Sequence, residues 1–297
     1  LPGRDSTPSR PVRIWVHLHP YGDGRKLLLT RDVTALEQAD AMRRDFVANV
    51  SHEIRTPLTV LTGFVETLQT LQLDAEERAR YLAMMAQQAA RMQSVVHDLL
   101  TLSRLEGSPL PGMSEWTPVQ ALMQRCEEES RALSAVLTQN HQRHHVLQFP
   151  AAQDLRAAGD IAGVPSELQS ALSNLISNAV RYTPAGGTIT VQWRYTADGN
   201  AIFSVSDTGP GIAPEHIPRI TERFYRVDRS RSRETGGTGL GLAIVKHAVQ
   251  RHGATLDITS ALGKGSVFSV TFPANRLRRP ALPDGLQPTA SAQTALP

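Results

Sequence analysis

The apolar residues between positions 47 and 99 recur at helical spacing, and this periodicity constrains the fold more than any other feature of the sequence. In the first stretch they lie three or four residues apart: Val47, Val50, Ile54, Leu58, Leu61, Val65 and Leu68. A stricter alternation of three and four, typical of a heptad seam, follows at Leu82, Met85, Ala89, Met92, Val96 and Leu99. The pattern breaks near residues 73–74. The sequence therefore predicts two long helices that fold back as an antiparallel hairpin.

Each of these helices carries one apolar stripe, and two such helices bury little surface by themselves. Pairing two hairpins from two chains would bury both stripes in a four-helix bundle. We therefore expect a homodimer in which residues 35–106 form the shared bundle.

The residues before this hairpin have the alternation of β-strands. Residues 12–18 and 25–33 predict two strands joined by a glycine-rich turn at 21–24. Because two strands alone are only marginally stable, we expect this pair to end a sheet whose other strands lie outside the sequence.

The segment GSPLPG at 107–112 has the composition of a linker, and residues 107–115 are assigned to it. Alternating helical and strand patterns follow and predict one domain over residues 116–275. The expected helices are 119–137, 165–181 and 240–251, and the expected strands are 146–149, 155–157, 188–195, 201–206, 255–259 and 266–272. The tail, residues 276–297, is rich in Pro, Ala, Gln and Thr, which predicts disorder. The predicted fold class is thus α+β, a helical hairpin followed by a domain of mixed helices and strands.

Length and composition set outer limits on the kind of protein. The 297 residues suffice for about two domains, with 40% hydrophobic and 20% charged residues, as in a globular protein. No apolar run approaches the ~18 residues of a membrane span. Because the sequence begins without Met and without an apolar leader, we expect it to be part of a longer protein. Its one cysteine, Cys126, allows no internal disulfide, and a net charge of +3 gives little support to direct nucleic-acid binding.

The sequence NVSHEIRTPLTV at 49–60 places reactive side chains on the first predicted helix. With Val47 at zero and 100° per residue around the helix axis, the apolar stripe spans roughly 300° to 20°. His52 falls at about 140° and Thr56 at about 180°. The two side chains therefore share an exposed face, with Glu53 at its flank. A neighbouring carboxylate can hold one imidazole nitrogen and leave the other available for attack.

An ordinary explanation also exists, because an exposed helical histidine is usually just solvated surface. Two observations favour a function: Pro57 within a helix normally costs about 3 kcal/mol, and the apolar spacing shifts at the same point. From these residues alone, a reaction centre and a polar surface with a helix bend both remain open.

Three further clusters lie in the second domain, each with an ordinary alternative. In LSNLISNAVRYT, Asn174 and Asn178 lie one turn apart with Arg181 following, an arrangement that suits Mg²⁺ but also any polar helix face. In SDTGPGIAP, Asp207 ends a strand, and Gly209 and Gly211 allow close approach of a flat ligand, although the motif is also ordinary turn chemistry.

The third cluster is ETGGTGLGLAIVKH at 234–247, where glycines lead into an apolar helix. Such a loop forms an anion cradle from backbone N–H groups and the helix dipole, but its spacing matches neither a P-loop nor a dinucleotide fingerprint. Just upstream lies an arginine-rich stretch that predicts a cationic lid over a nucleotide, or else a solvated basic loop: Arg223, Arg226, Arg229, Arg231 and Arg233.

The order of these clusters resembles that of the bacterial sensor histidine kinases, and most closely the phosphate-regulon branch of that family. The resemblance covers about residues 12–273 and rests on SHEIRTPL, NLISNAVRYT, DTGPGI, RFYRVD and GGTGLGLAIVKH. It implies a dimeric phosphoacceptor hairpin, forming a four-helix bundle, followed by an ATP-binding domain that is an α/β sandwich of the GHKL type. Residues 1–34 would be the end of a PAS domain. It also implies ATP and Mg²⁺ as cofactors, a response regulator receiver domain and phosphate-transport regulatory proteins as partners, and an inner-membrane protein whose cytoplasmic portion this is.

The resemblance also implies a role for individual residues. His52 would accept the γ-phosphoryl group, Glu53 would orient or deprotonate its ring, and Thr56 would position a water that dephosphorylates the partner. Asn178, helped by Asn174, would hold Mg²⁺. The remaining nucleotide-binding residues would be Arg181, Tyr182, Asp207, Gly209, Gly211, Phe224, Tyr225, Gly237, Thr238, Gly239, Leu240 and Gly241.

Two alternative functions are weighed against this expectation. One is a GHKL ATPase that does conformational work without a phosphohistidine, which the His-Glu-x-x-Thr arrangement on a separate hairpin argues against. The other is a dimeric scaffold with a vestigial nucleotide fold, which the complete set of Asn178, Asp207 and the glycines argues against.

Overall fold

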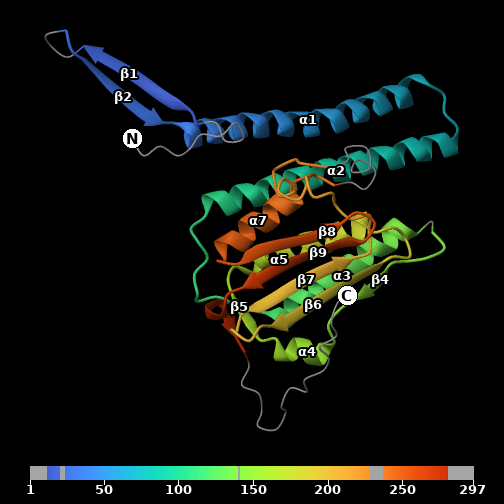
Figure 1. The fold of residues 1–297 in the computed structure, drawn as a ribbon. Coiled ribbons are helices and arrows are strands. Elements are labelled where there is room, and N and C mark those ends of the chain that lie inside the picture. The colour runs from blue at the N-terminus through green and yellow to red at the C-terminus, as the bar shows by residue number, and fades with distance from the viewer. Residues whose placement is uncertain (1–11, 21–23, 140, 228–236, 280–297) are drawn as a thin grey trace. The chain divides into compact units, whose positions relative to one another are not determined.

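The structure is a computed structural model, and it describes residues 12–20, 24–139, 141–227 and 237–279 (Figure 1). The chain divides into two compact units, Leu1–Met92 and Gln93–Pro297. None of the helices in the described part of the chain combines the length and the hydrophobicity that a membrane crossing requires.

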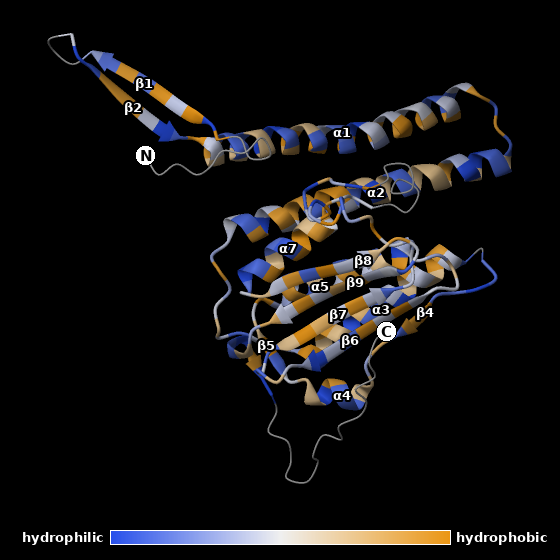
Figure 2. Cartoon of the chain, in the orientation of Figure 1, coloured by the Kyte–Doolittle hydropathy of each residue, from blue (hydrophilic) through white to orange (hydrophobic). Residues whose placement is uncertain are grey.

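The first unit begins with the predicted strand pair, which the structure confirms. β1 (Ile14–Pro20) pairs antiparallel with β2 (Lys26–Asp32). Large apolar side chains along both strands are about half exposed, and these hydrophobic residues are orange in Figure 2. A two-stranded sheet with exposed apolar residues on its strands fits the expectation of a sheet that continues elsewhere, while the PAS assignment stays a prediction. Most of the predicted turn, residues 21–23, lies outside the described residues.

The predicted helical hairpin is also confirmed. α1 (Thr34–Thr70) and α2 (Ala75–Gly107) are separated by a short break at the predicted position. Asp74 and Glu77 form a capping box at the start of α2, because the N–H of Glu77 donates to Asp74 Oδ1 at 2.7 Å and the N–H of Asp74 donates to Glu77 Oε2 at 3.3 Å. Within the first unit, the rings of Phe64 and Tyr81 lie 5.5 Å apart and join the two helices.

α1 runs without interruption through Pro57, although a proline there was expected to bend the helix. Pro57 is the one residue of α1 that is buried, so its ring contributes packing, and it has no N–H to donate within the helix. Around it, hydroxyl groups donate to carbonyls one turn earlier, from Thr56 to His52 and from Thr59 to Arg55, both at 3.0 Å.

α2 carries two apolar stripes rather than the single one that the sequence analysis identified. Val95, Leu102 and Leu105 are buried in the second unit. In contrast, Leu82 and Val96 of the predicted seam are 52% and 44% exposed in the single chain. One stripe therefore belongs to the fold of the chain itself, and the other is available for a partner helix.

The second unit is a sandwich of one sheet and one helical layer (Figure 1). The sheet has the order β4-β6-β7-β9-β8, formed by β4 (Val146–Gln148), β6 (Thr188–Tyr195), β7 (Ala201–Asp207), β9 (Gly265–Phe272) and β8 (Thr255–Ala261). All its neighbours are antiparallel except β4 and β6. The helical layer consists of α3 (Val119–Thr138), α5 (Pro165–Tyr182) and α7 (Gly241–Arg251).

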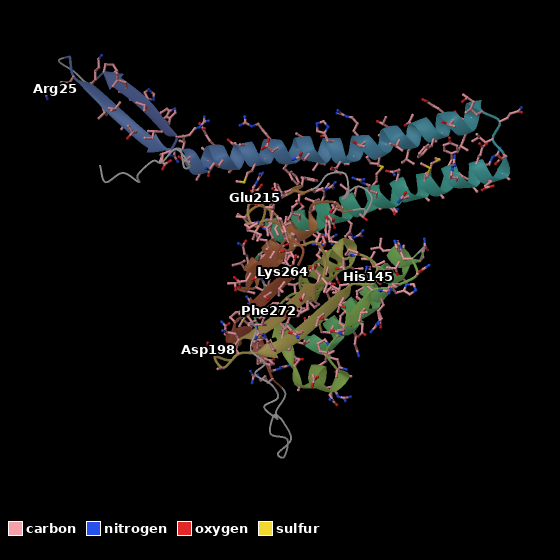
Figure 3. All side chains as sticks on the ribbon, turned by 45° about the vertical axis from the view of Figure 1, so that its right-hand side comes forward. Arg25, His145, Asp198, Glu215, Lys264 and Phe272 are labelled. Carbon is pink, nitrogen blue, oxygen red and sulfur yellow. The ribbon has the colours of Figure 1, made fainter. Side chains whose placement is uncertain are left out.

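The core lies between this sheet and the helices. Leu172 and Ile176 of α5 are almost fully buried against the strands, as are Phe203 of β7 and Phe272 of β9. Figure 3 locates Phe272 and, near the α3 end of the layer, His145. The ring of His145 hydrogen-bonds the Ser134 hydroxyl at 3.0 Å and the Thr183 carbonyl at 2.9 Å, which links the segment before β4 to α3 and to the end of α5.

One predicted strand was wrong. Residues 152–157 form a short helix, α4 (Ala152–Ala157), whereas the strand follows as β5 (Asp160–Ala162). The sequence AQDLRA consists mainly of good helix formers, and Gly159, with a φ of 66°, makes the turn into the strand. β5 is the centre of a small sheet with β3 (Trp116–Pro118) and β10 (Leu277–Arg278).

The prediction of disorder from residue 276 onward was also wrong for the first residues of that segment. A 3-10 turn, Ala274–Arg276, leads into β10, which pairs antiparallel with β5. Arg276 donates to the carbonyls of Gly112 and Ala162 at 3.2 and 3.1 Å, and Arg278 donates to Asp160 at 2.6 Å. These long-range bonds hold a segment whose composition alone predicts disorder. Residues 280–297 lie outside the described residues.

The segment that was expected to be a permissive linker is held by an arginine. Arg251, at the end of α7, donates to the carbonyls of Leu105, Ser108 and Pro109 at 2.7 to 2.9 Å. Its two remaining N–H groups bind Glu167 of α5, both at 3.0 Å, and both side chains are largely buried. All five donors of the guanidinium are thus used, and the end of α2 is fixed to the second unit.

Candidate functional site

The face of α1 that carries His52 agrees with the predicted geometry. His52 and Thr56 are both exposed, one turn apart, and the Thr56 hydroxyl donates to the His52 carbonyl at 3.0 Å. The carboxylate of Glu53 is half-buried and accepts a hydrogen bond from Arg91 of α2 at 3.1 Å. The ion pair with Arg91 therefore fixes the carboxylate of Glu53, the residue that follows His52 in the sequence. The sequence analysis did not anticipate this contact.

In the second unit, the elements of the predicted nucleotide site meet through α5, the end of β7 and the beginning of α7. The Asn174 side-chain nitrogen donates to the Ser170 carbonyl at 2.8 Å, which directs its oxygen toward α7. A Cβ on Gly241 would lie 2.6 Å from that oxygen. Only glycine at position 241 therefore lets α7 begin this close to the asparagine face of α5.

Asp207 ends β7 as predicted and is 92% buried, with a relative exposure of 8%. Burial raises the pKa of its carboxyl, because desolvation disfavours the charged form, while N–H groups of Gly209 and Ser266 act in the opposite direction. The Gly209 N–H donates to Asp207 Oδ1 at 2.8 Å. A buried carboxylate with a raised pKa and fixed donors is typical of a binding site for a polar ligand group.

The glycines after Asp207 are required by close backbone contacts. A Cβ on Gly209 would lie 3.0 Å from the Tyr182 carbonyl oxygen, and one on Gly211 would lie 2.0 Å from the Ala261 carbonyl oxygen. Gly211 also has a φ of 72°, which L-residues with side chains rarely adopt. The loop thus rests against the end of α5 and the turn after β8, and the Gly263 N–H donates to the Pro210 carbonyl at 2.8 Å.

The predicted aromatic pair is joined to the glycine loop. The Phe224 N–H donates to the Gly239 carbonyl at 2.8 Å, and Phe224 has a φ of 60°, which is strained for a bulky residue. A Cβ on Gly239 would lie 3.0 Å from the Phe224 Cα. The Tyr225 hydroxyl hydrogen-bonds the His216 ring at 2.8 Å, and Arg219 stacks on the Tyr225 ring at 4.3 Å. These contacts anchor the segment that leads to the predicted lid.

The structure describes the predicted phosphate cradle from Gly237 onward, whereas residues 234–236 lie outside the described residues. Gly237, Thr238 and Gly239 are half-buried, and Leu240, which precedes the first residue of α7, is fully buried. The predicted lid residues Arg229, Arg231 and Arg233 lie outside the described residues.

Sequence reasoning missed Asp98, which contacts this loop. The Thr238 hydroxyl donates to Asp98 Oδ2 at 2.6 Å, and both residues belong to the second unit. Asp98 lies on α2, far from the glycine loop in sequence, and as a polar residue between helical apolar positions it gave no local signal.

Arg181 and Tyr182 are the last two residues of α5, which ends one residue later than predicted. Burial lowers the pKa of the Arg181 guanidinium, and the charges of Tyr182 and Asp98 oppose that shift. Tyr182 is 45% exposed, so its ring is accessible to a ligand beside the Asp207 loop.

The side-chain amides of Asn174 and Asn178 fit a Mg²⁺ site in which the protein supplies only a few of the ligands. The described residues contain no group of three His, Cys, Asp or Glu side chains that could enclose a metal ion. Amide oxygens are hard ligands, and Mg²⁺ typically uses few protein ligands together with water and substrate phosphate oxygens. The half-buried Asn178, one turn from Asn174, fits that kind of site rather than a metal cage made by the protein alone.

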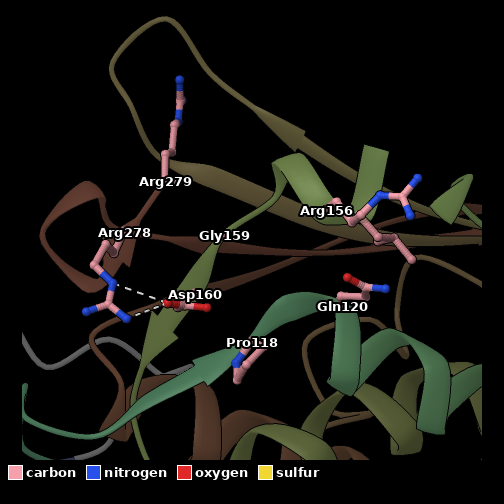
Figure 4. Close-up of a pocket in the computed structure, with 8 residues that line it drawn as sticks. Pro118, Gln120, Arg156, Gly159, Asp160, Arg278 and Arg279 are labelled. Atoms are coloured by element: carbon pink, nitrogen blue, oxygen red, sulfur yellow. Dashed lines mark hydrogen bonds and ion pairs between the residues drawn. The ribbon is translucent and has the colours of Figure 1, made fainter. Parts of the chain in front are cut away.

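A separate hollow of about 460 Å³ lies near the small sheet (Figure 4). Its lining includes Arg156, Asp160, Arg278 and Arg279, and Figure 4 shows Arg278 bound to Asp160. None of the residues predicted to bind nucleotide lines it. This hollow is therefore no part of the candidate nucleotide site.

Comparison with protein families gives two matches along the chain. Residues 42–108 match the His Kinase A (phospho-acceptor) domain. Residues 163–276 match the histidine kinase-, DNA gyrase B- and HSP90-like ATPase family. The first match covers the helical hairpin with His52, and the second covers Asn174, Asp207 and the glycine loop.

Curated relatives include the phosphate regulon sensor protein PhoR of Pseudomonas aeruginosa, which is 48% identical over 262 residues. This alignment covers 88% of the chain and 57% of the relative. PhoR of Haemophilus influenzae is 36% identical, over 88% of the chain and 58% of the relative, and the sensor protein SrrB of Staphylococcus aureus is 34% identical, over 85% and 42%. The chain thus spans somewhat more than half the length of the PhoR proteins.

Solved structures give similar folds. The structure of full-length ShkA in complex with AMPPNP matches with a TM-score of 0.52 at 29% identity, covering 77% of this chain and 45% of that one. The histidine kinase AdeS of Acinetobacter baumannii matches with a TM-score of 0.54 at 21% identity, over 75% and 98%, which supports the fold alone.

These matches agree with the order of the elements, a helical hairpin with an exposed histidine followed by an α/β sandwich with a glycine loop. The chain belongs to the sensor histidine kinases and is a homologue of the phosphate regulon sensor proteins PhoR.

Proposed function

We propose that this chain is the kinase core of a two-component sensor, which phosphorylates His52 from ATP and passes the phosphoryl group to an aspartate of a response regulator. The observation that carries the proposal is the convergence of Asp207, the glycine loop and the asparagine face of α5 in one unit, with an exposed His52 on a separate hairpin. A nucleotide site and a nucleophile are the two parts that this reaction requires.

Each proposed role follows from the chemistry of the side chain. Asp207, held by two backbone donors, accepts a hydrogen bond from the adenine amine, and Gly209 and Gly211 leave room for the base. Tyr182 lies against the nucleotide, and Phe224 and Tyr225 anchor the lid. Backbone N–H groups of Gly237, Thr238, Gly239, Leu240 and Gly241 bind the phosphates at the N-terminus of α7.

The remaining groups neutralise charge and prepare the histidine. Asn178, with Asn174, would hold Mg²⁺, which when bound neutralises phosphate charge, and Arg181 contacts a phosphate. Glu53 orients the His52 ring or takes its proton, and its ion pair with Arg91 keeps the carboxylate in place.

The same helix turn supports a second proposed activity, dephosphorylation of the regulator. The exposed Thr56 hydroxyl lies one turn from His52 and can position a water molecule. Thr56→Ala should keep autophosphorylation but slow regulator dephosphorylation by at least about tenfold. Thr59→Ala is the matched control, because Thr59 makes the same hydrogen bond to a carbonyl one turn earlier. Equal losses in both variants would indicate a structural effect on α1.

The partners and the cellular context are proposed from the relatives. We infer a homodimer through α1 and α2, a response regulator of the PhoB-like type, a role in the response to phosphate starvation with contacts to phosphate-transport regulatory proteins, and a place on the cytoplasmic side of the inner membrane. The PhoR relatives are named phosphate regulon sensor proteins, which supports this assignment.

Labelling with γ-phosphate-labelled ATP and Mg²⁺ tests the central proposal. The chain should acquire a label that is stable in alkali and lost in acid, and His52→Ala should abolish it. His141→Ala, which removes another exposed histidine, should retain the label. ATP hydrolysis without any labelled protein would instead support an ATPase that does conformational work, and absence of both labelling and nucleotide binding would support a scaffold.

A further inference from the structure

Asp98 of α2 contacts the loop that we propose to bind the phosphates of ATP. The Thr238 hydroxyl donates to Asp98 Oδ2 at 2.6 Å and accepts a hydrogen bond from the Leu240 N–H at 3.2 Å. Leu240 directly precedes α7, so this hydroxyl connects the carboxylate to the N-terminus of that helix. A helix N-terminus is where phosphate oxygens bind most readily.

Asp98 also interacts through its charge with Arg181, the proposed phosphate contact at the end of α5. The charge of Arg181 lowers the pKa of Asp98, against the larger effect of burial, which raises it. In return, the charge of Asp98 raises the pKa of Arg181, again against the larger effect of burial. The charge of His97, next to Asp98, lowers the pKa of Asp98 more than that of Arg181 does, and the hydrogen bond from Thr238 lowers it most. The partly buried carboxylate therefore depends on Thr238 and on neighbouring cations for its compensation.

The position of Asp98 is fixed by the helix on which it lies. Val95, Leu102 and Leu105 on the same part of α2 are buried in the second unit, and Arg251 holds the Leu105 carbonyl at 2.8 Å. The carboxylate is thus presented to the glycine loop by a helix segment that is packed and anchored on both sides of Asp98.

We propose that Asp98 is an internal competitor of the nucleotide phosphates, which binds the Thr238 hydroxyl and attracts the charge of Arg181 when no nucleotide is bound. Carboxylate and phosphate oxygens are both anionic acceptors, so they compete for the same hydroxyl and the same guanidinium. The proposal rests on the proposed ATP site and adds a residue from the phosphoacceptor hairpin to it. By thermodynamic linkage, binding of the triphosphate weakens the hold of α2 on the glycine loop, and this hold weakens triphosphate binding by the same factor.

Calorimetric titration of the full chain tests this competition. The ligands are a non-hydrolysable ATP analogue with Mg²⁺ and, separately, adenosine, which has the base but no phosphates. Asp98→Asn removes the charge at nearly constant shape, and it should tighten binding of the triphosphate by at least about fivefold. Binding of adenosine should stay within about twofold. This difference separates competition with phosphates from a general change in structure.

A second variant tests the route through Arg181. In an Arg181→Gln background, where one of the contested donors is missing, the gain from Asp98→Asn should fall to less than about half of its value in the wild-type background. Glu76 is an exposed residue near the other end of α2. Glu76→Gln also removes one negative charge, and it should change the affinity neither for the triphosphate nor for adenosine. If Asp98→Asn fails to fold, Asp98→Ser removes the charge with a smaller side chain and should give the same readings.

Several results would overturn the proposal. Triphosphate affinity that is unchanged or weaker in Asp98→Asn would exclude competition, as would an equal gain for adenosine and triphosphate. If the wild-type chain binds both ligands and only the effect of Asp98 is missing, this inference fails while the ATP site stands. If the wild-type chain binds neither ligand, the proposed function itself fails, and the competition with it.

Discussion

Asp207 combines a cost in stability with a proposed role in binding. Its carboxyl is buried, and burial raises its pKa above the ordinary value of 3.8 despite N–H groups of Gly209 and Ser266 that lower it. The folded state therefore takes up a proton more readily than the unfolded state. The contribution of this group to stability is greatest at low pH and is lost as the pH rises from 3.8 through the folded pKa.

Asp207→Asn should separate these two effects. At pH 7 the variant should be at least as stable as the wild type in urea denaturation, because it removes a charge that burial disfavours. The difference should shrink as the pH is lowered through the folded pKa, and it should level off below 3.8, where the wild-type group is protonated in both states. In the same variant, affinity for adenosine should fall by about tenfold, which corresponds to the loss of one hydrogen bond to a charged group. Lower stability at pH 7 would contradict the direction of the pKa shift.

Gly211 offers a residue-scale test of the loop geometry. Gly211 and Gly253 have similar positive φ values, 72° and 64°, but only at Gly211 would a Cβ meet backbone, at 2.0 Å from the Ala261 carbonyl oxygen. Gly253→Ala should therefore cost about 1 kcal/mol, from its backbone conformation alone. Gly211→Ala should cost roughly 1 to 3 kcal/mol more, measured by denaturant unfolding, because the loop must also shift. Equal costs would mean that the contact with Ala261 relaxes freely.

At the scale of elements, α2 serves two partners along one helix. Its buried stripe of Val95, Leu102 and Leu105 belongs to the second unit, and its exposed stripe includes Leu82 and Val96. A heptad pattern reports only that a helix has an apolar side, and it does not identify what covers that side. The anchoring of the α2 end by Arg251 shows why the composition of a linker does not establish its mobility.

Arg251→Met tests this anchoring. The variant leaves Glu167 largely buried without its partner, so the second unit should lose about 3 kcal/mol of stability in denaturant unfolding. A second change, Glu167→Met in the same chain, should restore part of the loss. Arg131→Met, which breaks an exposed ion pair with Glu127, is the control and should cost about 0.5 kcal/mol or less. A loss at Arg251 no greater than at Arg131 would contradict a structural role.

At the scale of the whole molecule, the exposed apolar side chains of the hairpin support the proposed homodimer. Leu82 and Val96 are 52% and 44% exposed, and they follow the predicted heptad seam along α2. Apolar residues repeated in this way are stable in water when a second helix covers them. A dimer would complete the bundle that the single hairpin leaves open.

Sedimentation analysis of Leu82→Lys with Val96→Lys tests the dimer. Two charges in the proposed seam should raise the dimer dissociation constant by at least about tenfold, or about 1.4 kcal/mol. Leu110→Lys places one such charge at a residue that is 75% exposed in the segment after α2, and it should leave the constant unchanged. Dimerisation that persists in the double variant would place the interface elsewhere.

The sequence by itself determined the elements and much of the candidate site. Helical and strand periods located the hairpin and most strands, because burial of one face imposes a regular spacing along the chain. The residues of the site lay in short motifs such as SDTGPGIAP, where local chemistry and backbone freedom are encoded together. One exception was residues 155–157, where a single buried leucine in a short segment could not distinguish a strand from α4.

Only the tertiary structure decided the contacts between distant segments. The hydrogen bond from Thr238 to Asp98, the hold of Arg251 on the end of α2 and the ordering of residues 276–279 each join parts of the chain that are far apart in sequence. Such contacts leave no periodic signal, because each depends on where two folded elements meet rather than on the preference of either one. The sequence thus names the groups that can do the chemistry, and the fold decides which of them compete for the same partner.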